Sequence, residues 1–393
     1  MRKFLWTAGK DGRGVYWVSW DKVTRQKRLG GLGISKMSEV NAALLVKWAW
    51  RFKCEQNGLW RKVVLSIHGG RNKWEFLPIK KTIPGCWKSI AGFLEKLRIN
   101  DQTLISLMTC RLGDGNCISF WKDVWFGERS LMHRWPILFA ADNNKNSTVA
   151  DRIKQSEGLV VLNNDWNLNA TTVEAISEVQ DVRWMLTQVK FSGNKDVWMW
   201  GPNGDQTFSV AAVKDSMRKA VNAQVTQRMK WVSWVPLKVN ILLWRIEMDR
   251  VATRLALVKR IQIPDTLCPM CNVDAESTSH LFVTCGFSYG VWSIIWAWCK
   301  LHPVNFNSID ELLEWLGSLQ MSTWGKRIIR GIVMVTCWAV WKERNKKIFK
   351  NGSPKVVEVV AMVKSLSFLW FCHRSSRYKV EWNEWVKYPL YIL

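Results

Sequence analysis

The amino-acid sequence predicts a mainly α-helical protein that carries small β-hairpin elements. Three observations support this fold class. Apolar residues recur at helical spacing in several segments, of which Thr323–Lys350 is the longest. Turns rich in Gly, Asp and Asn, at 113–116 and 201–205, interrupt runs of bulky residues in a way typical of hairpins. Three cysteines and a histidine occur within 268–285, between short segments with helical patterns, which is typical of a helical region held by a metal ion.

The composition indicates a folded protein that attracts polyanions. With 393 residues, 48% of them hydrophobic, the chain is large enough for two or three domains with real cores. Lys and Arg number 57 against 32 Asp and Glu, a formal net charge of +25 at pH 7. Nucleic acid is the commonest partner of such a charge. Most of the 28 tryptophans are expected in the core, and a few could stack on unpaired bases.

The cysteine pattern and the apolar runs predict an intracellular protein, in the nucleus or the cytoplasm, with reduced thiols and no membrane segment. The N-terminal apolar run is too short for a secretory signal. The stretches 328–341 and 291–298 are interrupted by Arg330 or are shorter than the ~20 residues of a membrane span. Seven cysteines lack the spacing of a disulfide framework: Cys54, Cys86, Cys110, Cys117, Cys299, Cys337 and Cys372.

The first predicted region is residues 1–145, mostly helical. Residues 1–36 carry a net charge of +7, and their Gly30-Gly31-Leu32-Gly33 run lacks the Lys-Ser/Thr of a phosphate-binding loop, so we interpret it as a turn. Within 41–60 the apolar residues share one helical face. They are Ala42, Leu45, Val46, Ala49 and Phe52.

Two β-hairpins are predicted from turn chemistry. The first, near 107–121, joins 107–112 to 117–121 through a Gly-Asp-Gly-Asn turn whose residues tolerate positive φ. The second joins 197–200 to 207–209, and Ser209 then caps a helix over 210–221.

Three carboxylates near these turns are candidates for catalysis. Turn formation explains Asp114 and Asp205 more simply than a catalytic role does. Asp123 is a candidate without such an explanation. We assign a catalytic role to none of the three.

An acidic stretch suggests a division of the chain near residue 145. Residues 142–182 hold seven acidic and three basic residues, in contrast to the basic remainder. We therefore expect residues 146–223 to form a linker region that contains the second hairpin and its helix.

The third region, 224–302, contains the clearest chemical signal. Cys268, Cys271, His280 and Cys285 offer three thiolates and an imidazole at a spacing that suits tetrahedral Zn²⁺. Four protein ligands leave no position for water, so the site is expected to be structural. The alternative is buried core cysteines with an ordinary histidine. Glu276 either accepts the second ring N–H of His280 across one helical turn or is a solvated charge, and the sequence leaves both open. Helices are predicted around the site at 236–248, 253–261 and 287–299.

The last region, 303–393, is predicted to be helical and basic. The helix Thr323–Lys350 should end at Asn351-Gly352, and a further helix covers 356–371. The basic end of the longer helix either contacts phosphates or is a solvated face. Glu343 and Glu358 are expected there as surface partners of the cations. The candidate nucleic-acid contacts are Arg344, Lys346, Lys347 and Lys350.

The run from Cys268 to Cys285, continuing as Gly-Phe-Ser-Tyr-Gly-Val-Trp292, resembles the reverse-transcriptase zinc-binding domain of plant non-LTR (LINE-type) retrotransposon polyproteins. The flanks resemble the same family, upstream at 231–245 and downstream at 338–349. So does 4–60, although Arg28-Leu29 stands where the family has an acidic residue. The resemblance implies that the chain corresponds to the segment between the polymerase palm and the ribonuclease H domain. In the family this segment helps to hold nucleic acid, and other parts of the retroelement machinery are its expected neighbours.

The resemblance also implies that this segment is not an enzyme by itself. A polymerase of this class needs a paired Asp-Asp metal site, and no Asp-Asp occurs in the sequence. The ribonuclease H carboxylates of the family follow the 341–345 segment, and we expect the chain to end at Leu393 before that domain. RNA or single-stranded DNA is the expected partner. The alternatives are a zinc-stapled protein-interaction module, an enzyme in its own right and a non-functional retroelement remnant.

Overall fold

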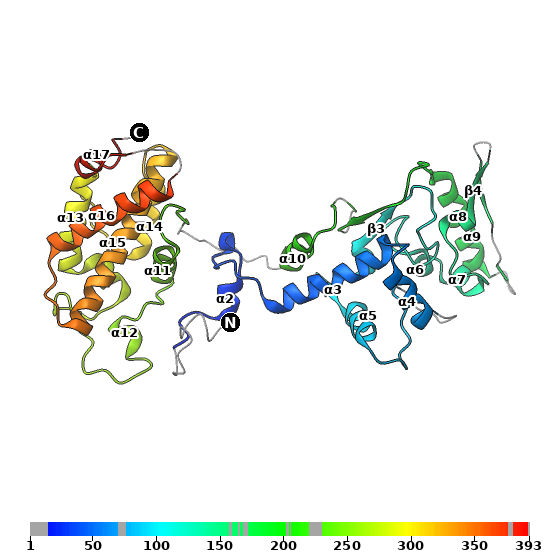
Figure 1. The fold of residues 1–393 in the computed structure, drawn as a ribbon, viewed down its shortest axis with the longest axis horizontal. Helices are drawn as coiled ribbons and strands as arrows, with labels where there is room; N and C mark the ends of the chain where they lie inside the picture. The colour runs from blue at the N-terminus through cyan, green and yellow to red at the C-terminus, as the bar shows by residue number, and fades with distance from the viewer. Residues whose placement is uncertain are drawn as a thin grey trace. The chain divides into compact units, whose positions relative to one another are not determined.

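A computed structural model describes residues 15–69, 76–156, 159–163, 166–167, 172–201, 204, 206–219, 230–375 and 380–391. The chain divides into two compact units, Ser35–Ala223 and Met1–Ile34 together with Gln224–Leu393. About half of the structure is helical and its sheets are small (Figure 1), so the predicted mainly α-helical class is confirmed.

The unit Ser35–Ala223 is built around one apolar face of helix α3 (Met37–Cys54). Of the predicted stripe, Ala42, Val46, Ala49 and Phe52 are buried and Leu45 is half-buried, and Ala43, which the stripe did not include, is buried as well. The other helices are α4 (Leu59–His68), α5 (Cys86–Lys96), α6 (Leu131–Arg134), α7 (Pro136–Ala141), α8 (Val149–Arg152), α9 (Val173–Gln188), α10 (Val210–Lys219) and the 3₁₀ turn η2 (Ile105–Leu107).

The strands of this unit form three two-stranded antiparallel pairs. Strand β3 pairs with β6, so the first predicted hairpin, near 107–121, is wrong: Met108 lies opposite Trp200 and Arg111 opposite Val197. Residues 117–121 contribute no strand, and Ser119 forms only an isolated bridge with Thr148. The strands are β1 (Arg98–Ile99) with β2 (Gln102–Thr103), β3 (Met108–Arg111) with β6 (Val197–Trp200), and β4 (Ile153–Ser156) with β5 (Leu159–Leu162).

The side chain of Asp196 explains why the 113–117 segment turns without closing a local hairpin. Its Oδ1 accepts the backbone N–H groups of Gly113 at 2.8 Å and Gly115 at 2.9 Å, and its Oδ2 accepts that of Cys117 at 2.9 Å. Bonds from backbone N–H groups to a charged acceptor are stronger than neutral ones. Asp196, the residue immediately before β6, therefore holds the turn that follows β3. The two strands pair although 85 residues lie between Arg111 and Val197.

Of the second predicted hairpin a single bridge is present, and residues 207–209 form no strand. Strand β6 continues into an isolated antiparallel bridge between Trp200 and Gln206. Ser209 caps α10, because its Oγ accepts the N–H of Ala212 at 3.0 Å. Asp205 and residues 220–221 lie outside the described residues.

The predicted boundary near residue 145 does not divide the chain into separate units. Asp142 and Arg152, on either side of it, are both buried and form an ion pair in the same compact unit. The Asp142 carboxylate also accepts the indole N–H of Trp121 at 2.5 Å. Residues 142–182 include α8, β4 and β5 and most of α9, so this acidic stretch contains regular elements of the compact unit and is not a linker.

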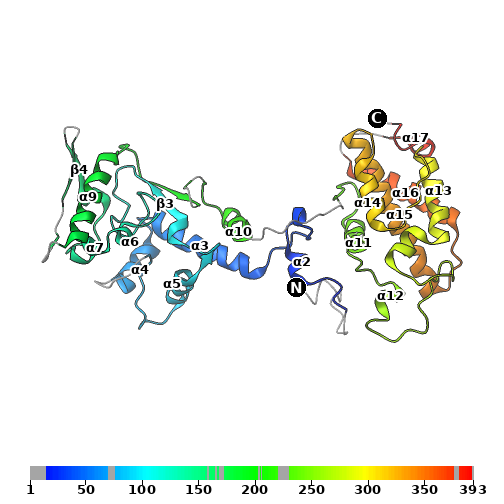
Figure 2. The same ribbon diagram turned by 180° about the vertical axis from the view of Figure 1, so that it is seen from behind.

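The other unit is a helical assembly around α15 (Thr323–Lys350), which packs against α11, α14 and α16 (Figures 1 and 2). Residues 328–337 of α15 are buried all round. At Gly331 a Cβ would lie 1.9 Å from the ring of Trp234, so only glycine permits this close approach. The remaining elements are α2 (Trp20–Thr24), η1 (Lys27–Leu29), α11 (Leu237–Glu247), α12 (Arg254–Leu257), η3 (His280–Thr284), α13 (Gly286–Trp298), α14 (Ile309–Ser318), α16 (Val356–Arg374) and α17 (Trp382–Lys387).

The predicted helix ends in this unit are largely observed. Asn351 adopts φ 49° and ends α15 where the sequence predicts. Helix α12 is shorter than the predicted 253–261. The Gly30-Gly31-Leu32-Gly33 run forms a turn, and the Gly30 carbonyl accepts the indole N–H of Trp244 at 2.8 Å.

Among the described helices, α16 has the length and apolar composition of a membrane span. It packs against α13, α15 and α17, and its buried residues belong to the core of the unit. A core helix of a folded protein has the same length and composition, so this feature is weak support for a membrane segment. The buried residues are Val359, Val360, Val363, Ser367 and Phe371.

Candidate metal centre

The four predicted zinc ligands converge in the unit that contains α15. Cys268 and Cys271 lie on a tight turn whose backbone is closed by hydrogen bonds from Cys268 N–H to Asp274 O and from Asn272 N–H to Cys268 O. His280 begins the π-helical turn η3, and Cys285 lies directly between η3 and α13. The Cys285 N–H donates to His280 O at 2.8 Å, which fixes the second pair of ligands relative to each other.

The ligand atoms have the separation that one tetrahedral ion requires. All four lie within 4.8 Å of one another. The sulfurs of Cys268 and Cys285 are 3.9 Å apart, and Cys271 Sγ is 3.2 Å from His280 Nε2. A tetrahedral zinc with Zn–S bonds of ~2.3 Å places two sulfurs ~3.8 Å apart. Cys268 and Cys285 are fully buried and His280 nearly so, which suits a structural centre closed to solvent.

The two buried sulfurs are electrostatically coupled. The hydrogen bond between them raises the pKa of Cys268, as does burial, and the same bond lowers the pKa of Cys285 because it stabilises that thiolate. Without a metal ion, two sulfurs this close share one proton between them. A divalent cation stabilises both thiolates together, and this donor set of soft sulfurs and one imidazole favours zinc.

The imidazole of His280 is oriented for coordination through Nε2. Its Nδ1 faces Thr284 Oγ1 at 3.5 Å and Asp274 Oδ2 at 3.7 Å. A neutral ring that binds metal through Nε2 carries its proton on Nδ1, and these oxygens can accept it. Neither residue was predicted from the sequence. Asp274 lies in the segment 268–285 that carries the four ligands, here called the metal loop, and ligand spacing alone does not single it out.

The predicted role of Glu276 beside His280 is wrong. Glu276 precedes η3 and is not on a helical turn with the histidine. Its carboxylate is fully buried and accepts two hydrogen bonds from Arg344, from Nε at 2.7 Å and from Nη2 at 2.8 Å. The Arg254 N–H donates to the same carboxylate at 2.7 Å. Glu276 therefore ties the metal loop to α15 and to the start of α12.

Arg344 consequently cannot serve as the predicted surface contact for nucleic acid. Its side chain is 3% exposed. Besides the bidentate pair with Glu276, Nη2 donates to Ala252 O at 3.2 Å, and the guanidinium lies over the ring of Trp341. Buried arginine in a planar, doubly hydrogen-bonded pair is a structural element. The pair joins residues 68 positions apart, which no local pattern in the sequence indicates.

Three of the four predicted cations remain accessible at the end of α15. Lys346 is half-exposed and pairs with Glu343 and Glu358. Glu343 is buried, contrary to the expected surface position. Lys347 is partly exposed and Lys350 exposed, and no ion pair to either is present among the described residues. These two lysines are the remaining candidates of the predicted set with accessible, unpaired charges in the described part of the chain.

The described aspartates near the first turn have structural partners. Asp114 accepts the N–H of Asn116, as a turn residue does. Asp123 is buried, pairs with Lys53 at 2.5 Å and accepts the N–H of Ser119 at 2.8 Å. Both carboxylates therefore hold local structure.

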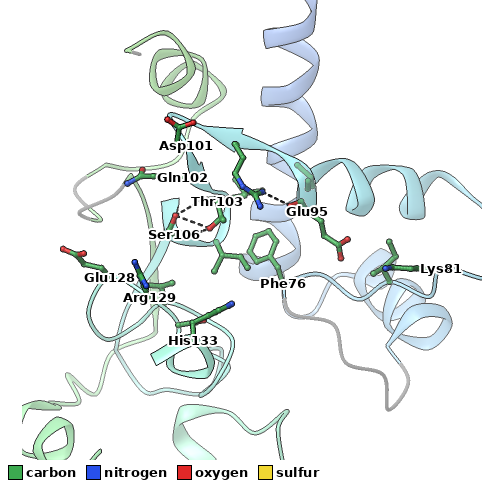
Figure 3. A pocket seen from close by; sticks show the side chains of 17 residues that line it. Phe76, Lys81, Glu95, Asp101, Gln102, Thr103, Ser106, Glu128, Arg129 and His133 are labelled. Atoms are coloured by element: carbon green, nitrogen blue, oxygen red, sulfur yellow. Dashed lines mark hydrogen bonds between the residues drawn. The ribbon is translucent and has the colours of Figure 1, made fainter. Parts of the chain in front are cut away.

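A cavity of about 990 Å³ lies in the Ser35–Ala223 unit, beside α5, the β1–β2 pair and the 128–133 segment (Figure 3). Its lining mixes three cations with three carboxylates, so its charge favours neither an anion nor a cation. The charged lining residues are Lys81, Arg98, Arg129, Glu95, Asp101 and Glu128, with His133 at the wall.

Comparison with known proteins places the ligand cluster in a recognised region. Residues 208–292 match the family described as zinc-binding in reverse transcriptase. The chain is 26% identical over 370 residues to the "Putative ribonuclease H protein At1g65750" of Arabidopsis thaliana, which covers 90% of this chain and 55% of that protein. It is 27% identical over 127 residues to the "Uncharacterized mitochondrial protein AtMg00310" of the same plant, and this match covers 32% of this chain and 77% of that protein. The chain thus spans about half the length of the first relative. No solved structure matches.

The matched region contains all four residues of the Cys₃His cluster. The spacing, the convergence of the ligand atoms and the family match agree. Together they support a retrotransposon-derived protein that carries a region of the reverse-transcriptase zinc-binding type between residues 208 and 292.

Proposed function

We propose that the chain is a zinc-stabilised accessory segment of a LINE-type retroelement reverse transcriptase, from the C-terminal part of the polyprotein, and that it holds single-stranded RNA or DNA. The observation that carries the proposal is the family match over the residues that build the Cys₃His cluster. The net charge of +25 supports a polyanionic partner. In this role the zinc fixes a loop, and surface cations do the binding.

The end of α15 is one part of the proposed binding surface. It presents Lys346, Lys347 and Lys350 beside Phe349, whose ring is 77% exposed. An exposed aromatic ring among cations suits a nucleic-acid strand, since phosphates pair with the cations and a base can stack on the ring. Glu343 and Glu358 neutralise part of this charge through Lys346.

Replacing Lys346, Lys347 and Lys350 by glutamine is expected to weaken binding of a single-stranded oligonucleotide and to reduce its salt dependence. On single strands log K falls with log salt by ~0.7 per phosphate contact, so three lost contacts lower the slope by about 2. Fluorescence anisotropy between about 50 and 200 mM salt measures both quantities. Arg344 stays intact, which keeps the fold. If the native chain fails to bind at low salt, the protein-interaction alternative is favoured.

We further propose that the chain has no catalytic activity by itself. Among the described residues the one group of three or more metal-binding side chains is the Cys₃His cluster, which leaves no coordination position for substrate or water. Because one relative is named a ribonuclease H protein, an RNA–DNA hybrid is the substrate to test. With Mg²⁺ or Mn²⁺ the purified chain is expected neither to cleave the hybrid nor to extend a primer. Turnover abolished by a single Asp or Glu substitution would contradict this proposal.

A further inference from the structure

A second, smaller cavity of about 150 Å³ lies beside the metal loop. Its walls are Trp17, the turn after α11, the α12 segment and Ser277 of the metal loop. Pockets for drug-sized molecules typically measure ~300–1,000 Å³, so this cavity suits a group of the size of a phosphate. The lining residues are Trp17, Asp249, Arg250, Thr253, Leu255, Ala256, Lys259, Arg260 and Ser277.

The cavity is lined by three cations and one carboxylate, and the cations have no ion-pair partner in the part of the chain that the structure describes. Arg250, Lys259 and Arg260 are all exposed, and among the described residues no ion pair engages any of them. Asp249 is the single carboxylate in the lining, and its Oδ1 accepts the hydroxyl of Thr278 at 2.5 Å. Three unpaired cations around one small hollow attract an anion that can approach all three.

Two of the three cations, Arg260 and Arg250, have aromatic or backbone contacts. The guanidinium of Arg260 lies 5.2 Å from the centre of the Trp17 ring, and that of Arg245 lies 5.5 Å from it. Arg245 Nε also donates to Arg250 O at 2.9 Å, and the Arg250 N–H donates back to Arg245 O at 2.8 Å. Burial lowers the pKa of Arg245 to about 10, which still leaves it charged at neutral pH. Trp17 therefore supports the Arg260 side chain, and Arg245 fixes the backbone at Arg250.

The metal loop forms one wall of the cavity and is bonded to the start of α12. Ser277 lines the cavity and its Oγ accepts the His280 N–H at 2.9 Å. The start of α12 is tied to Glu276 twice, through Arg254 N–H to the carboxylate and through Leu255 N–H to the backbone carbonyl at 3.2 Å. The segment that carries Lys259 and Arg260 thus depends on a loop that the metal ligands organise.

We propose that Arg250, Lys259 and Arg260 form a phosphodiester-binding site for a single-stranded nucleic acid, positioned by the zinc loop and backed by Trp17. This inference rests on the proposed nucleic-acid function and specifies a second set of residues for it, none of which belongs to α15. The zinc centre acts through position only, since its ligands orient the loop that forms one wall of the site.

The test compares two triple variants of the full, zinc-loaded chain that remove the same number of charges. One carries Arg250→Gln, Lys259→Gln and Arg260→Gln. The control carries Lys238→Gln, Lys300→Gln and Lys387→Gln, three exposed lysines of the same unit that do not line the cavity. Binding of a fluorescein-labelled oligouridylate is measured against salt, and zinc content and melting temperature report the fold.

The cavity variant is expected to bind on the order of 100-fold more weakly at 0.1 M salt. The slope of log K against log salt is expected to fall in magnitude by about 2, as the loss of three phosphate contacts predicts. The control variant is expected to change much less. Equal behaviour of the two variants, with the native chain still binding, would overturn the cavity site and leave the proposed function standing. A native chain that does not bind would overturn both. Lys259→Glu alone, which reverses one exposed charge, must weaken binding more than Lys300→Glu if the site is real.

Discussion

Cys271→Ser is expected to abolish stoichiometric zinc binding and to lower the melting temperature of the unit that contains α15 by about 10 °C or more. Metal binding to such a site contributes directly to folding, with apparent values of ~10–16 kcal/mol in zinc-finger peptides. The loss here is smaller than that, because the metal loop also packs into the core through Leu281, Phe282 and Val283. A loss of several kcal/mol corresponds to about 10 °C or more, at ~2–4 °C per kcal/mol for a unit of this size.

Elemental analysis and calorimetry measure the two effects on the native chain and the variant. Cys372→Ser is the matched control, since Cys372 lies in the same unit, is only partly buried and is not a ligand. It should retain one zinc per chain and nearly the native melting temperature. The assignment of the cluster as a zinc site fails if the native chain contains no zinc, or if Cys271→Ser keeps both its metal and its stability.

The metal centre could be predicted from the sequence because its geometry is local. All four ligands lie within residues 268–285, and a Cys-x-x-Cys turn holds the first pair close whatever the rest of the fold does. The bounds of α15 were predictable for a similar reason. Ser322 caps its start and Asn351, with φ 49°, ends it, and both signals lie next to the helix they limit.

Pairings between distant segments could not be predicted in this way. The turn at 113–116 has the composition of a hairpin, yet β3 pairs with β6 because Asp196 binds the turn's backbone N–H groups from 79–83 residues away. The sequence contains no sign that this one aspartate, among many, does so. The buried ion pair of Asp142 and Arg152 was hidden for a different reason, since an acidic, polar segment is usually a solvated one.

The same limit explains the assignment of Arg344 to a basic surface. Residues 342–350 read as one cationic helix end, and sequence spacing does not show which side of α15 each cation faces. The structure separates them: Arg344 faces the metal loop and is buried, whereas Lys347 and Lys350 face outward. The candidate cations at Arg250, Lys259 and Arg260 were missed because Trp17, which lines the same cavity and contacts Arg260, lies more than 200 residues earlier in the chain.

Arg344→Met is expected to destabilise the unit by about 3–5 kcal/mol, the typical cost of breaking a buried ion pair by removing one partner. The cost arises because Glu276 stays fully buried and loses two of its three donors, while Arg254 N–H remains. The double variant Glu276→Met with Arg344→Met should be less destabilised than the sum of the single variants, because replacing both charges by apolar groups removes the unpaired charge. Chemical denaturation of the zinc-loaded protein measures all four members of this cycle.

Lys342→Met is the control for the cycle, since Lys342 is exposed on the same helix and should change stability by no more than ~0.5 kcal/mol. Zinc affinity is a second measured quantity, and a simple packing defect elsewhere in α15 would not change it. Glu276 holds the metal loop at its centre, so Arg344→Met should weaken zinc retention against a competing chelator, and the control should not. An Arg344→Met protein as stable as the control, with unaltered zinc retention, would mean that the buried pair does not connect the metal loop to α15 and that Arg344 is free to act at the surface.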